Sequence, residues 1–326
     1  MACPTRSLRS IVAAGLALAS GAAAAYDATL IDLGTLGGAN AYAAAVSAGG
    51  RVAGCAETGS GEIHAFVWQG GRMTDLGRGA EAAGNSCALA VNDRGLAAGR
   101  ASTGELVLWE GTAARSLGIR GDIGDMNDAG TVVGARAEGG STRAFVYASG
   151  VLTELGEPGT RSEATAVNAR GQVVGSANGH AFLYESGVLT DLGTLGGNMS
   201  VARAINSGGE IVGQAANEFG QPTPFIHRGT MQALPGPSYS SAVAISASGK
   251  VAGSGEGVYG YVIAGGAVTR LSELPAVVAK GWRKLEPTAM NDRGWIVGTA
   301  ENANGDLRAF LLVPRSDAKP YRPSAR

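Results

Sequence analysis

The residues of this chain best suited to chemistry are its three histidines, because imidazole is a common general base and metal ligand. His64 and His180 occupy the same place in two distant copies of the repeat described below, and His227 stands where other copies have Trp or Tyr. A zinc site needs three or four converging ligands. No Gly-x-Ser-x-Gly sequence supplies a nucleophile, and no histidine has a partner recognisable from the sequence. We therefore predict neither a metal site nor a catalytic triad.

Two further motifs resemble binding loops but are predicted to be turns. The sequence DLGTLGG, at 32–38 and 191–197, lacks the Lys-Ser/Thr pair and the following helix of a phosphate loop. The NDRG and NDAG segments lack the alternating acidic ligands and the distal Glu of an EF-hand calcium loop. We predict no cofactor.

The chain is organised as seven copies of a repeat of roughly 40 residues. Each copy has Asn or Ser, then Gly three residues later, and then a second Gly four residues further on, which closes a Val-x-Gly-like run. These closing glycines are Gly54, Gly99, Gly134, Gly175, Gly213, Gly253 and Gly298. Coincidence at three registered positions in seven copies is not credible, so the repeat determines the architecture.

Each copy is predicted to form four short strands. The first two form a hairpin, in which the Asn or Ser side chain bonds nearby backbone and the Gly takes a positive φ. The third is exemplified by HAFLY at 180–184 and the fourth by LTDLG at 189–193, while a helical period appears only around 271–285. A small Ala recurs on six of the first strands, where the third copy has Asp125. Short antiparallel strands at this spacing are typical of propeller blades.

The N-terminal segment is predicted to supply the fourth strand that the seventh copy lacks. The seventh copy stops at Leu312-Val313 without a fourth strand, and the chain begins with an unmatched fourth strand at 29–34. Pairing these segments removes an exposed sheet edge. We therefore predict an all-β fold, a seven-bladed β-propeller of four-stranded blades over residues 26–313 that is closed by the N-terminal strand, followed by a disordered polar tail at 314–326.

At GSGEIHAFVWQGGRMTDLG and NGHAFLYESGVLTDLGTLGGNMSVARAINSGGEIVG the chain resembles the HAF-repeat family of probable extracellular bacterial proteins. The family is named for the His-Ala-Phe tripeptide, present here at His64 and His180. The resemblance covers nearly all of residues 29–313 and implies export and a repeat architecture. It implies no activity and no catalytic residues, so no site can be carried over.

The connections between strands divide into two kinds. The turns from first to second strand are uniform, whereas the connections from second to third strand and from fourth strand to the next first strand vary, as in GRGAEAAGNSC and GIRGDIGD. Both variable sets emerge on one face of a propeller, which we expect to hold the mouth of the axis. Loops on a rigid scaffold are where binding residues usually lie.

Two groups on that face are candidate ligand-binding residues. The first group stands near the expected mouth and consists of Tyr42, Asp122, Glu163, Arg203 and Glu286. It is consistent with a cation or sugar site, but a solvated rim is the favoured interpretation. The second group, Trp282 and Arg283, lies in the longest insertion. Trp282 either stacks on a sugar or a partner, or is buried beneath a loop that covers the mouth.

Cys55 and Cys87 are predicted to form a disulfide. Cys55 follows the second strand of the first copy and Cys87 precedes the first strand of the second copy, which places both on one face of adjacent blades. An oxidising compartment would favour the bond. The alternative is two unpaired buried thiols.

The N-terminus and the composition place the protein outside the cytoplasm. Residues 1–25 have the pattern of a signal peptide: Arg6 and Arg9, then the apolar stretch 11–19, and the small residues 23–25. We expect a periplasmic or extracellular monomer with no membrane span. The formal net charge of −1 gives no case for a nucleic-acid partner.

These features favour a binding module that presents its variable loops to a glycan or a protein. One alternative is an exported glycan lyase or hydrolase that uses Asp122, Glu163 or Glu286 as acid–base groups, provided that two of these carboxyls lie roughly 5–10 Å apart. Another alternative is an architectural envelope protein. We expect binding rather than catalysis.

Overall fold

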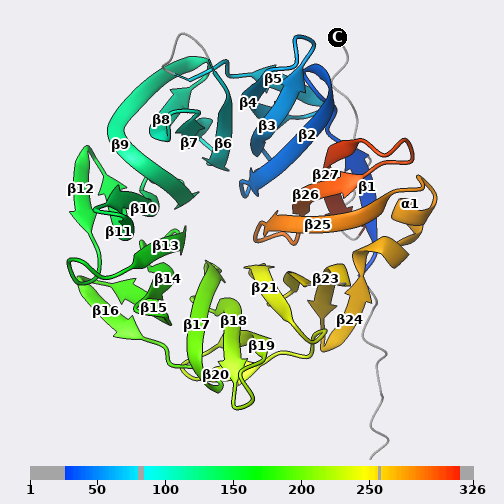
Figure 1. Ribbon diagram of the computed structural model, residues 1–326. Helices are drawn as coiled ribbons and strands as arrows, with labels where there is room; N and C mark the ends of the chain where they lie inside the picture. The colour runs from blue at the N-terminus through cyan, green and yellow to red at the C-terminus, as the bar shows by residue number, and fades with distance from the viewer. Residues whose placement is uncertain (1–25, 80–83, 256–257, 316–326) are drawn as a thin grey trace, which may run out of the picture.

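The computed structural model describes residues 26–79, 84–255 and 258–315, and in these residues nearly every element is a β-strand. The strands form five four-stranded sheets and one seven-stranded sheet, all with antiparallel pairing. The sheets stand in a ring around a central axis, with one inner strand of each four-stranded sheet and two of the seven-stranded sheet nearest the centre (Figure 1). The predicted all-β propeller fold is therefore confirmed.

The strand pairing divides into seven four-stranded units, numbered here along the chain. Unit 1 contains β2 (Gly37–Val46), β3 (Val52–Thr58), β4 (Ile63–Gln69) and β5 (Arg72–Asp75). Unit 2 contains β6 (Ser86–Val91), β7 (Leu96–Ala101), β8 (Glu105–Glu110) and the first part of β9 (Ala113–Met126). Unit 3 contains the second part of β9, β10 (Val132–Glu138), β11 (Ser141–Ala148) and β12 (Val151–Glu154).

Units 4 to 7 repeat the same order of strands. Unit 4 contains β13 (Ser162–Val167), β14 (Val173–Ala177), β15 (His180–Glu185) and β16 (Val188–Asp191). Unit 5 contains β17 (Gly196–Ile205), β18 (Ile211–Asn217), β19 (Pro222–His227) and β20 (Met231–Ala233). Unit 6 contains β21 (Ser240–Ile245), β22 (Val251–Gly255), β23 (Val258–Ala264) and β24 (Ala267–Arg270). Unit 7 contains β25 (Arg283–Met290), β26 (Ile296–Glu301), β27 (Leu307–Pro314) and β1 (Ala28–Asp32).

The N-terminal strand completes unit 7. β1 pairs antiparallel with β27 from Ala28 opposite Pro314 to Asp32 opposite Phe310. Arg308 binds the Asp32 carboxylate at 3.1 Å, and the Tyr26 hydroxyl donates to the carbonyl of Gly294. The first and last parts of the chain thus share one sheet, as the count of strands predicts.

Strand β9 corrects one expectation. The segment 118–125 was predicted to be a variable connection between the second and third copies, but it lies within one continuous strand. Residues 113–120 of this strand pair with β8, and residues 121–126 pair with β10. This long strand is why two units merge into a single seven-stranded sheet (Figure 1).

A bulge in each inner strand explains the closing glycines. In all seven units the pairing of the inner strand skips one residue opposite the closing glycine. A β-bulge bends its strand, and the bend brings a carbonyl against the neighbouring strand. A Cβ added to Gly213 would lie 2.0 Å from the carbonyl oxygen of Val201 and 3.0 Å from the ring of Phe225. Only glycine therefore fits at this position.

The apolar core lies between neighbouring units rather than in one central mass. Five phenylalanines of the third strands are almost fully buried: Phe66, Phe145, Phe182, Phe225 and Phe310. Each core cluster combines residues of two adjacent units or of units 7 and 1. Stability consequently depends on every junction of the ring.

The ends of the predicted domain fall partly outside the described residues. The proposed leader, 1–25, and residues 316–326 of the proposed tail lie beyond them. Pro314, which was assigned to the tail, is the last residue of β27, and the Arg315 amide donates to the carbonyl of Asp27. No helix within the described ranges is long and apolar enough to cross a membrane.

Candidate functional site

The ring has two different ends. The variable-loop face is the end where connections from second to third strands and from fourth strands to the next unit emerge. The turn face is the end that carries the Asn-x-x-Gly and Ser-x-x-Gly turns between first and second strands. These definitions follow from the alternating direction of the four strands in each unit.

Exposed aromatic side chains are confined to the variable-loop face among the described residues. Phe219 is 77% exposed at the tip of the β18–β19 connection, and Tyr239, 52% exposed, directly precedes β21. Tyr259 is the second residue of β23, and Tyr42 lies toward the same end of β2. Aromatic rings that remain in water on loops are typical anchors for a ligand.

The five residues predicted near the axial mouth are all on inner strands, but they do not form one cluster with a shared partner. Asp122 and Glu163 occupy equivalent positions on adjacent units, whereas Glu286 lies on unit 7. Arg100 binds the Asp122 carboxylate at 2.6 Å. Arg203 is the bulged residue of β17 and faces the axis.

Two environments were predicted for Trp282, exposed or buried, and in the structure it is buried. The insertion forms a 3₁₀ turn, η1 (Leu271–Glu273), and one turn of helix, α1 (Pro275–Val278). Trp282 is only 7% exposed and packs with Leu274 and Val277 in the core between units 6 and 7. It is therefore not available to stack on a ligand.

The cations next to Trp282 are engaged in ion pairs. Arg283 binds Glu301 at 2.6 Å and Lys284 binds the same carboxylate at 2.8 Å. These two cations hold the pKa of Glu301 below its ordinary value, mainly through the hydrogen bond from Lys284. The insertion thus fills the junction of units 6 and 7, whereas Arg283, 62% exposed, pairs with Glu301 within unit 7.

Cys55 and Cys87 form a disulfide, with their Cα atoms 4.7 Å apart. Both lie inside strands, Cys55 in β3 and Cys87 in β6, and not beyond the strand ends as the sequence suggested. A groove of about 360 Å³ borders Cys87 on the variable-loop face, with Arg100 and Ser102 in its wall.

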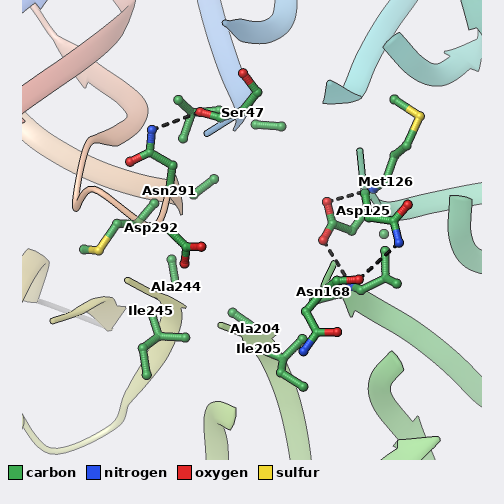
Figure 2. Close-up of a pocket in the computed structure, with 18 of the residues that line it drawn as sticks. Ser47, Asp125, Met126, Asn168, Ala204, Ile205, Ala244, Ile245, Asn291 and Asp292 are labelled. Atoms are coloured by element: carbon green, nitrogen blue, oxygen red, sulfur yellow. Dashed lines mark hydrogen bonds between the residues drawn. The ribbon is translucent and has the colours of Figure 1, made fainter. Parts of the chain in front are cut away.

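A second hollow, of about 260 Å³, lies on the axis toward the turn face (Figure 2). Its wall contains the bulged residue of every inner strand: Ala44, Leu89, Gly124, Thr165, Arg203, Val243 and Thr288. Of the five residues predicted at the mouth, only Arg203 lines it. The other four therefore lie outside the axial hollow.

Asp125 is the distinctive residue of the axial hollow. Its carboxylate accepts the amide of Met126 at 2.7 Å and, across the junction with unit 4, the amide of Val167 at 3.1 Å (Figure 2). Removal from water raises its pKa to about 6, and the two amide hydrogen bonds oppose that shift. Asp125 therefore links two units at the axis while carrying a poorly hydrated charge.

The histidines of the His-Ala-Phe tripeptides have partners that sequence reasoning missed. His64 Nδ1 lies 3.0 Å from the Asp75 carboxylate, and His180 Nδ1 lies 2.8 Å from Asp191. Both carboxylates belong to the Asp-Leu-Gly segment of the adjacent fourth strand, eleven residues later. Arg308 and Asp32 form the corresponding pair in unit 7. The sequence does contain a signal for these pairs: in both copies the histidine of the third strand and the aspartate of the fourth strand are eleven residues apart, at equivalent positions of the repeat.

The described residues contain no group of three or more His, Cys, Asp or Glu side chains that could hold a metal ion. His64 Nε2 also lies 3.8 Å from the Glu62 carboxylate, which Arg78 binds, so the His64–Asp75 pair belongs to a small group of ion pairs, and His180–Asp191 is a cross-strand ion pair. The pairing affects the Asp191 carboxyl. Burial raises its pKa, but the hydrogen bonds from the Gly193 amide and from His180 outweigh burial, so the pKa is below the ordinary value.

Comparisons with known proteins add little to this geometry. No protein family and no curated protein matches the chain. Among solved structures, the chain is similar to a mutant of the Aleuria aurantia lectin in complex with alpha-methyl-L-fucoside, with 9% identity and a TM-score of 0.37 over 90% of this chain and 98% of that one. A likeness at this level carries no argument, and the fold rests on the strand pairing described above.

Proposed function

We propose that the protein is a non-catalytic binding module whose variable-loop face holds a glycan. The observation that carries the proposal is that Tyr42, Phe219, Tyr239 and Tyr259, the exposed aromatic residues of the described chain, all lie at that face. The turn face shows none among the described residues. Tyr147, Tyr184 and Trp295 lie toward the turn face but are partly buried, so the most exposed rings gather on the variable-loop face, as expected of a recognition surface.

The setting of these rings favours a sugar over a protein partner. The rings lie on separate loops and strands, and polar residues such as Asn217, Glu218 and Ser241 stand between them in sequence. Protein interfaces have a contiguous, desolvated apolar centre. A sugar instead offers a small apolar face, for one ring to cover, and hydroxyls for the surrounding polar groups.

Export is part of the proposal. The pattern of residues 1–25 predicts a leader, and the Cys55–Cys87 disulfide supports an oxidising compartment. The resemblance to the HAF-repeat family points the same way. Expression of the full chain with its leader, followed by fractionation and N-terminal sequencing of the product, tests this part; a product that retains residues 1–25 in the cytoplasm would contradict it.

Glycan-array binding by the oxidised full-length protein, followed by titration calorimetry, tests the proposed function. Replacement of Phe219, Tyr239 or Tyr259 by Ala is expected to weaken binding about three- to tenfold for each ring that contacts the sugar. Val188→Ala is the control, because Val188 is 62% exposed but lies on the outer strand β16 at the turn-face end.

Three results would contradict the proposal. They are the absence of glycan binding, equal loss in the control variant, and release of reducing ends from a bound polysaccharide. The last result would support the lyase or hydrolase alternative. In that case Asp122→Asn, Glu163→Gln and Glu286→Gln would show which carboxyl is needed.

A further inference from the structure

An asparagine belt joins five of the seven junctions of the ring on the turn face. In each case the side-chain amide of the turn asparagine donates to the main-chain carbonyl at the same position of the next unit. The bonds are Asn92 to Asn127, 3.3 Å; Asn127 to Asn168, 3.1 Å; Asn168 to Asn206, 3.1 Å; Asn206 to Ser246, 3.0 Å; and Asn291 to Ser47, 2.9 Å. Both bonded groups are buried, so each bond is well shielded from water.

Two junctions lack this bond because the turn residue is serine. Ser47 is in unit 1 and Ser246 in unit 6, and each hydroxyl oxygen accepts an amide of its own turn, from Arg51 and Lys250 respectively, at 3.1 Å. A hydroxyl also stands closer to its own backbone than a carboxamide nitrogen does. The belt is therefore interrupted between units 1 and 2 and between units 6 and 7.

The two interrupted junctions carry the two features that no other junction has. Between units 6 and 7 lies the helical insertion, whose Leu274, Val277 and Trp282 fill the core of the junction. Between units 1 and 2 lies the Cys55–Cys87 disulfide. Five of the nine buried members of the apolar core at that second junction are alanines, Ala53, Ala65, Ala88, Ala97 and Ala101, and Trp109 is its largest side chain.

We infer that the Cys55–Cys87 bond, toward the variable-loop end of the junction of units 1 and 2, compensates for the belt contact missing at its turn-face end and makes this junction a redox-sensitive seam of the ring. Both cysteines are partly exposed, so a small thiol can reach them. A thiolate of a dithiol attacks one sulfur, the S–S bond breaks, and the other cysteine leaves as a thiolate. The second thiol of the reductant then releases the first cysteine, so the protein gains two electrons and two protons as the dithiol becomes a disulfide.

Reduction is expected to loosen this junction and leave the others closed. Without the disulfide, this junction keeps its apolar core, the exposed hydrogen bond from the Gly49 amide to Asp93, 2.7 Å, and the buried hydrogen bond from the Ala65 amide to the Ser86 hydroxyl, 2.8 Å, whose counterparts other junctions have in addition to a belt contact. The five belt contacts at other junctions do not depend on the disulfide. Local opening is thus expected at β3 and β6, which border the seam, before the ring unfolds as a whole.

Hydrogen exchange of the full chain, oxidised and after treatment with dithiothreitol, tests the inference. Amides of β3 and β6 are expected to exchange on the order of a hundredfold faster after reduction, with β14 and β18 unchanged. The double variant Cys55→Ser, Cys87→Ser should behave as the reduced protein does. Uniform acceleration across all units, or none, would overturn the inference.

A second experiment introduces an asparagine at position 47, where the belt contact between units 1 and 2 is missing, and asks whether the junction is protected again. Ser47→Asn in the double-serine variant supplies an amide that can donate to the carbonyl of Asn92, which accepts the Gly95 amide and has a second lone pair available. Protection of β3 and β6 is expected to return. Ser246→Asn is the matched control at the other serine junction and should not restore it. If the double-serine variant does not fold, rescue of folding by Ser47→Asn alone supports the seam, and equal rescue by both changes contradicts it.

Discussion

A single residue, Asp125, shows how the repeat can be altered without losing the fold. The other six units have alanine at its position: Ala45, Ala90, Ala166, Ala204, Ala244 and Ala289. The small side chain suits the crowded axis, so a carboxylate there must be held by strong contacts. The amides of Met126 and Val167 provide them, and the second of these bonds joins two units.

Replacement of Asp125 by alanine is expected to change how stability depends on pH. The folded-state pKa of about 6 lies above the ordinary 3.8, so between these values the folded protein binds more protons than the unfolded chain. The free energy of unfolding of the wild type therefore falls as pH rises from about 4 to 7, by a contribution of about 2–3 kcal/mol at most. Relative to wild type, Asp125→Ala should gain stability over that range.

Urea unfolding of both proteins at pH 4.5 and pH 7.5 measures the difference. The alanine variant removes the charge together with two hydrogen bonds, so its stability at a single pH does not test the prediction. The test is whether the difference in free energy of unfolding between variant and wild type changes between the two pH values. Asp125→Asn, which is neutral but similar in size, serves as the control and should follow alanine in its pH dependence. A difference between wild type and variant that is constant with pH would show that the carboxyl has an ordinary pKa.

At the scale of the element, the inner-strand bulge determines two features at once. It brings a carbonyl against the closing glycine, and it turns one residue per unit toward the axis. The bulged residue therefore forms the wall of the hollow, where Thr165 and Thr288 also bond the neighbouring unit through their hydroxyls. One backbone irregularity thus links the glycine pattern to the axial surface.

Gly213→Ala tests whether steric exclusion is the reason for the closing glycine. The added Cβ would meet the Val201 carbonyl at 2.0 Å, and an expected loss of about 2–4 kcal/mol follows from overpacking a buried strand. Gly220→Ala is the control: Gly220 has φ +74° with nothing within 4 Å of the added atom, so only backbone strain of about 1 kcal/mol applies. Equal losses in thermal unfolding would show that conformation, not space, selects the glycine.

The elements were more predictable than the site, for a physical reason. Turn and strand signals are local and occur seven times in this chain, so they predicted the hairpins and the closing strand from residues such as Asn168 and Gly171. The bulged position has no preferred residue type, because Ala, Leu, Gly, Thr, Arg and Val all occur there. The direction of Arg203 and the end at which the hollow lies were therefore not predictable. Trp282 was equally ambiguous, because burial depends on how an insertion folds over the neighbouring unit.

At the scale of the whole molecule, the units form a closed ring, so its stability depends on every junction between neighbouring units. Most junctions share one device, the asparagine belt, while the serine junctions rely on a disulfide or on an apolar insertion. The remaining break is the one between the chain ends, inside unit 7. It is closed by β1, which buries Tyr26, Ala28 and Leu30 against the rest of the molecule.

Deletion of residues 26–34 after the proposed leader tests this closure. The deletion removes β1 and its ladder with β27, exposes the edge of β27 and leaves Arg308 without Asp32. Because the lost strand buries several apolar side chains, the melting temperature is expected to fall by more than about 10 °C, in a chain for which 1 kcal/mol corresponds to roughly 2–4 °C. A synthetic peptide with the sequence of residues 26–36 should raise it again in a concentration-dependent way, because it binds only the folded ring. A peptide in which Leu30 and Leu33 are replaced by Asp is the control and should not. A truncated protein that melts like the full chain would show that the ring does not depend on its N-terminal strand.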